Sequence, residues 1–171
     1  LLFGNEMVLN DSFQTTNQFY GGQIGGRLSG QIGYLLVSVA SKVALGSMHQ
    51  IVNIQGDITQ LGPNPLIPPG LGTLPGGIFA QSTNIGRRNV NPLSVPFAVM
   101  PTLELKFGCD LTERLRAFAG YDVIYWTQVL RPGKLIDHNV NLSQNAVLDP
   151  NGSGTLVGAA QPALLLSRSD F

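Results

Sequence analysis

The sequence has few charged residues, and neither acidic nor basic residues are in excess. Of its 171 residues, 12% are Asp, Glu, Lys or Arg, and ten basic residues balance ten acidic ones. That share of charge is about half the usual value for a soluble domain. A chain with no net charge and no run of Lys or Arg sets up no field that would attract nucleic acid. We therefore expect no nucleic-acid partner, and a surface that is not mainly exposed to water.

Long apolar runs are missing too. Runs such as those near Leu35 to Val37 and near Ala163 to Leu166 are only about four residues long, which excludes a transmembrane helix of about 20 apolar residues. A membrane-spanning barrel needs no such run, because its strands must be apolar only at alternate residues. The N-terminal LLFGNEMVL lacks an initiator Met, a basic region and a cleavage-site pattern, so it does not predict a signal peptide. We expect the sequence to be a piece of a longer chain, truncated at both ends.

Residues that could support catalysis or bind a metal are sparse. Cys109 is the single cysteine, which excludes an internal disulfide. The two histidines, His49 and His138, lack the close spacing of a zinc or catalytic motif. No serine lies in a G-x-S-x-G context, and the glycine clusters fit neither the Rossmann nor the P-loop spacing. We expect no catalytic residue, no metal site and no cofactor.

What the chain does contain is sustained alternation, clearest from Ser94 to Gln128. This stretch predicts two strands joined by a polar turn at Asp110 to Glu113, because each half repeats with period two. The apolar residues of the first half share one parity: Val95, Phe97, Val99, Leu103, Leu105 and Phe107. Those of the second half do the same: Leu115, Ala117, Ala119, Tyr121, Val123 and Tyr125.

The register of this hairpin follows from the position of its turn. A turn centred on Leu111 would place Phe107 opposite Leu115 and Phe97 opposite Tyr125. Pro101 lies on the apolar parity and lacks a backbone donor, so we expect a local distortion of the pairing there.

The length of the pattern favours a barrel wall. Phe97 and Phe107 are ten residues apart, which is roughly 34 Å along a strand at about 3.4 Å per residue. With a tilt of about 40 to 45° this projects to roughly 25 Å, the height of the lipid-facing band of a transmembrane barrel. Strands of globular proteins usually have about five or six residues.

The rest of the chain predicts further strands separated by alternately short and long connections. Residues 18–32 alternate, a turn follows at Gly33 and Tyr34, and a second alternating segment begins at Leu35 and loses its phase near Ser47 to Ile51. The expected non-strand segments are a loop or strand end at Asn5 to Asn17 and two long Pro- and Gly-containing loops at Asp57 to Pro92 and Leu130 to Gln161. The final PALLLSRSDF predicts the upper part of one more strand. We therefore expect an all-β chain, an antiparallel up-and-down transmembrane β-barrel fragment with about five visible strands and two long external loops, forming part of a single barrel domain over residues 1–171.

Six local sequences occur in the order found in a known family. They are FYGGQIGG at Phe19, KVALGSMHQ at Lys42, TNIGR at Thr83, RLRAFAGYDVIYW at Arg114, VLRPGKLIDHNVN at Val129 and the final SDF. From Asp11 to Phe171 the chain resembles the C-terminal portion of the beta-barrel porin family of planctomycete-type outer membranes. The resemblance implies an outer-membrane location and an up-and-down barrel, but no particular substrate and no catalytic residue. In the family the SDF segment runs on into a terminal strand, which is consistent with the expected truncation.

If the polar faces of these strands line a lumen, six charged side chains lie inside it: Arg27, Lys42, Glu104, Lys106, Arg116 and Asp122. In the register above, Lys106 faces Arg116 and Glu104 is diagonal to Arg116, so these charges either pair across strands or bias ion passage. Amphipathic rings near the edges of the lipid band are expected to form an aromatic girdle. Its predicted members are Tyr20, Phe97, Phe107, Tyr125 and Trp126.

These features lead to one main functional hypothesis and two alternatives. The main one is a barrel in the bacterial outer membrane that passes small solutes or ions passively, or that supports the envelope, with the two long loops as a steric gate. Its partners would be the lipid bilayer and those solutes, and a homo-oligomer is left open. A soluble secreted β-sandwich for adhesion or carbohydrate binding would instead pack the apolar face on a second sheet. An outer-membrane hydrolase using His49 or His138 is the third hypothesis.

Overall fold

The computed structural model describes residues 6–61, 73–90, 96–145, 148–149 and 155–170. Its regular elements are strands, with two single-turn 3₁₀ helices at Pro132–Lys134 and Leu142–Gln144. The strands are β1 (Glu6–Ile32), β2 (Leu35–Leu61), β3 (Thr73–Pro75), β4 (Gly86–Asn89), β5 (Phe97–Thr112), β6 (Leu115–Ile124), β7 (Val129–Leu130) and β8 (Arg168–Ser169). Among these residues no helix is long and apolar enough to span a membrane. The expected all-β class is confirmed.

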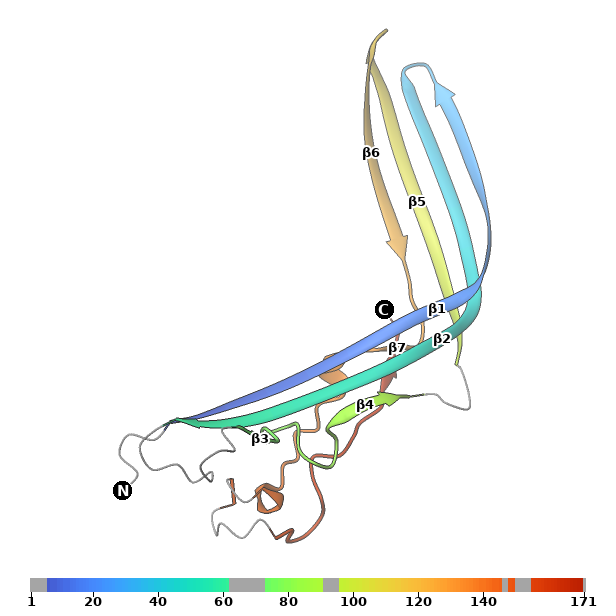
Figure 1. The fold of residues 1–171 in the computed structure, drawn as a ribbon. Coiled ribbons are helices and arrows are strands. Elements are labelled where there is room, and N and C mark those ends of the chain that lie inside the picture. Colours follow the sequence, from blue (N-terminus) through green and yellow to red (C-terminus); the bar gives the residue numbers. More distant parts are fainter. Residues whose placement is uncertain (1–5, 62–72, 91–95, 146–147, 150–154, 171) are drawn as a thin grey trace. The chain divides into compact units, whose positions relative to one another are not determined.

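The main sheet has the order β1-β2-β5-β6, with β3 and β4 added to β2. Its pairings along β2, β5 and β6 are antiparallel, and the four long strands run side by side in chain order (Figure 1). The expected up-and-down arrangement is therefore present. In the described residues the sheet is open, and β1 and β6 are its edges.

The chain divides into two compact units, and the boundary between them falls within β1 and within β2, so that each of these strands contributes to both units. The first unit comprises Leu1–Thr16, Gln50–Val90 and Leu130–Arg168. The second comprises Asn17–His49, Asn91–Val129 and Ser169–Phe171.

Two tight turns join the long strands of the second unit. The predicted turn at Gly33 and Tyr34 is confirmed, and Gly33 takes a positive φ of 60°, which glycine adopts without a steric penalty. The second turn lies at Glu113 and Arg114 rather than centring on Leu111. The Thr112 hydroxyl accepts a hydrogen bond from the Arg114 backbone N–H at 3.3 Å, which holds the chain in this turn.

Because the second turn lies later in the sequence than predicted, the register of the β5–β6 hairpin also differs from the prediction. Phe107 lies opposite Ala119, not Leu115, and a register shift occurs between Asp110 and Thr112. The predicted cross-strand partners are therefore wrong by four residues. The predicted faces are nevertheless right, because a shift by an even number of residues keeps every side chain on its side of the sheet.

Pro101 causes no break in the pairing, contrary to our expectation. The β2–β5 ladder continues through the pair Val43 and Pro101 without a shift. The Pro101 carbonyl accepts a hydrogen bond from the Tyr125 N–H at 3.0 Å, so the backbone polar groups at this position point toward β6. The missing N–H thus lies on the side where β6 has ended at Ile124, and pairing with β2 does not need it.

The first two strands extend beyond their predicted ends. Asn5 to Asn17 was expected to be a loop or strand end, yet β1 begins at Glu6, and β2 continues past Asp57 to Leu61. The unclear phase near Ser47 to Ile51 coincides with a change of partner, since β2 pairs with β5 up to Ser47 and with β4 from Ile51. Beyond this point Val52 and Ile54, which have the parity of the polar residues Ser38 and Lys42, are buried apolar residues, because loop residues pack against that side of the strand.

The expected last strand is much shorter than predicted. Among the described residues of PALLLSRSDF, Arg168 and Ser169 form the one strand, which pairs with β7 and not with the main sheet. The main sheet therefore has four long strands in place of about five.

The described parts of the two long loops are packed in the first unit. They contribute β3 and β4, which pair with β2 between Ile51 and Thr59. A core forms between loop and strand residues: Val52, Ile54, Ala80, Leu130 and Leu135, flanked by Phe13, Ile85, Val90 and Leu164. The expectation that these segments contain no strand is wrong for β3 and β4, and the second segment begins within β7. Residues 62–72, 91–92, 146–147 and 150–154 of the predicted loops lie outside the described residues.

Candidate functional site

The strands of the second unit place alternate side chains on two chemically different faces. Ser29 Oγ lies 2.9 Å from Ser38 Oγ, and Ala40 lies opposite Glu104, which lies opposite Asp122. Odd-numbered residues of β1 therefore share one side with even-numbered residues of β2, β5 and β6. We call this side the polar face and the other side the apolar face.

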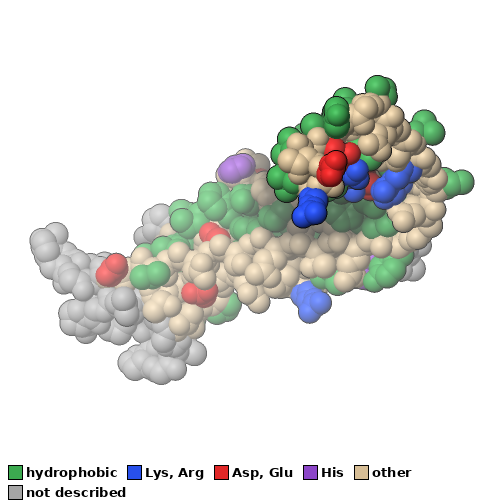
Figure 2. Space-filling view, turned by 90° about the horizontal axis from the view of Figure 1, so that it is seen from above, with side chains coloured by type: hydrophobic (Ala, Val, Ile, Leu, Met, Phe, Trp, Pro, Cys, Tyr) green, Lys and Arg blue, Asp and Glu red, His purple; other side chains and the backbone are tan. Residues whose placement is uncertain are grey.

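The apolar face is exposed. Ile24 and Leu28 are 78% and 81% exposed, while Ala40 and Ala44 on the opposite side of the sheet are buried. Other exposed members of the apolar face are Tyr20, Ile32, Leu35, Val39, Leu45, Phe97, Leu103, Phe107, Leu115, Tyr121, Val123 and Tyr125. Viewed onto the turn end, hydrophobic side chains line one side of these strands, and acidic and basic side chains gather on the other (Figure 2). A soluble protein rarely leaves so large an apolar surface uncovered.

All six predicted lumen charges lie on the polar face, and Glu104 joins two of them. Its carboxylate accepts from Arg27 Nη2 at 3.0 Å and from Lys42 Nζ at 2.5 Å. Arg27 comes from β1 and Glu104 from β5, so this ion pair crosses over β2. The crossing is sterically open because the β2 residue opposite Glu104 is the small Ala40.

The pairing of these charges differs from the prediction. Lys106 lies opposite Gly120, not Arg116. Asp122 lies directly opposite Glu104, an arrangement of like charges that destabilises a strand pair by itself. Arg27 and Lys42 offset this repulsion, because both bind Glu104.

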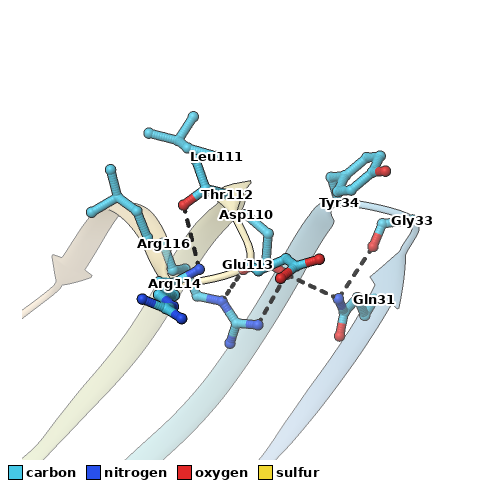
Figure 3. Close-up of a pocket in the computed structure, with 10 residues that line it drawn as sticks. Gln31, Gly33, Tyr34, Asp110, Leu111, Thr112, Glu113, Arg114 and Arg116 are labelled. Carbon is cyan, nitrogen blue, oxygen red and sulfur yellow. Dashed lines mark hydrogen bonds and ion pairs between the residues drawn. The ribbon is translucent and has the colours of Figure 1, made fainter.

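A second ion pair lies beside the turns. Arg116 donates from Nε and Nη2 to both carboxylate oxygens of Asp110, a bidentate geometry. Gln31 Nε2 donates to Asp110 at 3.3 Å and to the Gly33 carbonyl at 3.2 Å. These side chains converge from β1, β5 and β6 at an open hollow of about 880 Å³, whose lining also includes Leu111 and Tyr34 (Figure 3).

Asp110 and Gln31 were missed from the sequence. Asp110 was assigned to the turn, because that turn was placed too early. The signal that could have identified it is parity: Asp110 has the parity of Glu104 and Lys106, and a later turn makes it the partner of Arg116.

Two aromatic side chains on the polar face cover glycines. Gly108 pairs with Phe118, and the Phe118 ring lies 3.2 Å from where a Cβ of Gly108 would be. Phe19 precedes Gly21 by two residues on β1, and its ring lies 2.8 Å from the hypothetical Cβ of Gly21, which would also meet the backbone of Leu45 and Gly46. The rings replace packing that a glycine cannot supply, which explains why these two positions depart from the polar pattern.

The predicted girdle residues occupy different environments. Tyr20, Phe97, Phe107 and Tyr125 are exposed on the apolar face, whereas Trp126 follows β6 and is half-buried. Tyr125 pairs through its backbone with Pro101, so it does not lie opposite Phe97 as the earlier register required. Tyr34, which is 78% exposed at the first turn, is a further aromatic that the prediction omitted. That these rings form a girdle stays a prediction.

Within the described ranges no group of three or more His, Cys, Asp or Glu side chains could hold a metal ion. The His138 ring packs edge-on against Phe79, with centroids 5.8 Å apart. Cys109 is half-buried on β5.

Two carboxylates organise the loops of the first unit. Asp11 of β1 accepts hydrogen bonds from three successive backbone N–H groups, those of Ile78, Phe79 and Ala80, at 3.0 to 3.1 Å. Asp137 is buried and accepts from the N–H groups of Asn139 and Ala163. These backbone donors hold the pKa of the Asp137 carboxyl below its usual value, since they stabilise the charged form.

Comparisons with known proteins agree with this architecture. No curated protein and no solved structure matches the chain. A family match covers residues 2–171, almost the whole chain, and the family is described as Putative beta barrel porin-7 (BBP7). This is a porin family and not a family of enzymes. The resemblance seen in the six local sequences is thus confirmed, and the chain belongs to the Putative beta barrel porin-7 family.

Proposed function

We propose that the protein forms part of a β-barrel wall in a bacterial outer membrane and passes small solutes or ions by passive diffusion. The apolar face would meet lipid and the polar face would line the lumen. The observation that carries the proposal is the exposed apolar face, in which residues such as Ile24 and Leu28 stand out from strands long enough to cross a bilayer. Family membership supports the same function.

The described residues favour this function over a soluble β-sandwich. A sandwich buries its apolar face against a second sheet. The second sheet in the described part of the chain consists of β7 and β8, with two residues in each strand. Strands of two residues cannot cover a face that spans four long strands.

The long loops are proposed to restrict passage sterically. Their described parts are held by the first-unit core and by the Asp11 and Asp137 hydrogen bonds. A loop fixed by such contacts keeps one shape, as a constant steric filter requires.

The test is conductance of the purified protein in planar lipid bilayers. We expect discrete current steps of uniform size that increase with salt concentration. The control is the same detergent without protein. An inserted, folded protein that stays ion-tight would contradict passive passage, and would favour a structural role in the envelope.

A further inference from the structure

The basic and acidic side chains of the polar face are not equally accessible. In each ion pair the basic side chain is the more exposed member: Arg27 is 53% exposed and Lys42 37%, against 16% for their shared partner Glu104. Arg116 is 42% exposed against 24% for Asp110. A solute that approaches this face therefore meets the cationic groups first.

The number of charged residues on the polar face also favours a positive surface. Four basic residues and three acidic ones lie on it, which leaves one positive charge: Arg27, Lys42, Lys106 and Arg116 against Glu104, Asp110 and Asp122. Asp122 is an exposed acid, and Lys106, diagonal to it across the β5–β6 pair, is exposed as well. Exposed charge on the face is thus mainly positive.

An open hollow lies beside Arg27 and Lys42, the two cations that share Glu104. It has a volume of about 290 Å³ and is lined by Gln23, Gly25, Gly26, Arg27, Ala40 and Lys42. Its lining combines small residues with the donors of an amide, a guanidinium and an ammonium group. A guanidinium carries five N–H donors and an ammonium three, more than their bonds to Glu104 use. Such a group of donors suits a small anion.

We propose that this face makes the pore selective for small anions, with Arg27 and Lys42 as the residues that meet the anion and Glu104 as the positioning residue that holds both. This inference rests on the proposed function, since it requires that the polar face line a conducting lumen. Fixed positive charge along a lumen raises the local concentration of anions and lowers that of cations.

The test is the reversal potential of the protein in planar bilayers under a KCl gradient. We expect wild type to pass chloride more readily than potassium. The double substitution Arg27→Gln and Lys42→Gln should shift the reversal potential toward the equilibrium potential of potassium, because it removes two positive charges from the face. Glu104→Gln should shift it in the opposite direction, because it removes one negative charge while both positive charges remain on the face.

Two further variants separate a selectivity role from a structural one. Arg27→Lys keeps the charge and should keep the reversal potential of wild type. Ser29→Ala removes the contact between the Ser29 and Ser38 hydroxyls on the same face without changing its charge, and should leave the potential unchanged.

The outcomes also distinguish the two proposals. Conductance with potassium preference in wild type, or with no shift in either the double variant or Glu104→Gln, overturns anion selectivity and leaves the porin function standing. Folded, inserted protein without conductance overturns the porin function, and the selectivity with it. If the double variant does not fold, the direction of the Glu104→Gln shift decides.

Discussion

At the scale of single residues, a few side chains fix loops that have little regular structure of their own. Asp11 is the clearest case, because its carboxylate receives the backbone N–H groups of Ile78, Phe79 and Ala80. Gly77 lies so close that any side chain there would clash with Asp11. The strand and the loop are thus matched to each other at this point.

Asp11→Ala should loosen this loop. Removing the carboxylate leaves three backbone donors without their acceptor, so we expect a loss of about 1 to 3 kcal/mol in local stability. Hydrogen exchange at the amides of Ile78 to Ala80 measures it. As a matched control, Asn10→Ala removes one exposed bond to Asp57 and should have a smaller effect. Unchanged exchange in Asp11→Ala would show that the carboxylate does not hold the loop.

We expect Asp137 to make the first unit sensitive to acid. Its pKa is lower in the folded protein than in the unfolded chain, because backbone N–H groups stabilise the carboxylate. The stabilisation is therefore complete above the unfolded pKa of about 4 and declines as pH falls from there toward the lower folded value. We expect the protection of the Ala163 amide, measured relative to the intrinsic exchange rate at each pH, to fall over that range. Asp137→Asn should exchange faster at neutral pH and lose most of this acid dependence, whereas the same acid dependence in the variant would assign the effect to another group.

Residue chemistry was only partly predictable from the sequence. Parity alone placed Arg27, Lys42 and Glu104 on one side of the sheet, and the structure confirms that placement. Their partners could not be predicted, because a pair such as Arg27 and Glu104 depends on which strands are neighbours and on the small Ala40 between them.

At the scale of elements, alternation predicted the faces better than the ends or the register. When the register of a hairpin shifts by an even number of residues, every side chain stays on the same side of the sheet. The error of four residues in the β5–β6 register therefore left the predicted polar and apolar faces correct. The position of the turn depends on Thr112, Glu113 and Arg114, three residues without a distinctive turn sequence such as Asn-Gly. The ends of β1 and β2 were not predicted, because there the strands pack against loop residues, and the alternation of polar and apolar side chains is lost.

Pro101 provides a test of the observed register. If its backbone faces β6, Pro101→Val restores an N–H that can pair with Tyr125, and we expect a gain of about 0.5 to 1.5 kcal/mol. A protected amide at residue 101 of the variant, and slower hydrogen exchange at the Tyr125 amide than in wild type, would report it. Leu103→Val, which changes a side chain on the same face without adding a donor, serves as the control. A Pro101→Val variant that is less stable than wild type would place the backbone of this residue differently.

At the scale of the whole molecule, the central claim is that one face of the sheet meets lipid. The low charge of the sequence, its strand-length alternation and its family all agree with this claim. Neighbouring residues on β1 allow a direct comparison, because Ile24 lies on the apolar face and Gln23 on the polar face, and both are exposed. In water, a lysine at either position would be tolerated.

The decisive measurement is therefore the urea dependence of folding into lipid vesicles for Ile24→Lys and Gln23→Lys. We expect Ile24→Lys to lose about 2 to 4 kcal/mol of stability in the bilayer, the cost of a lysine facing the membrane interior. Gln23→Lys should stay close to wild type. Equal stability of the two variants, or folding of both without lipid or detergent, would contradict a lipid-facing apolar face.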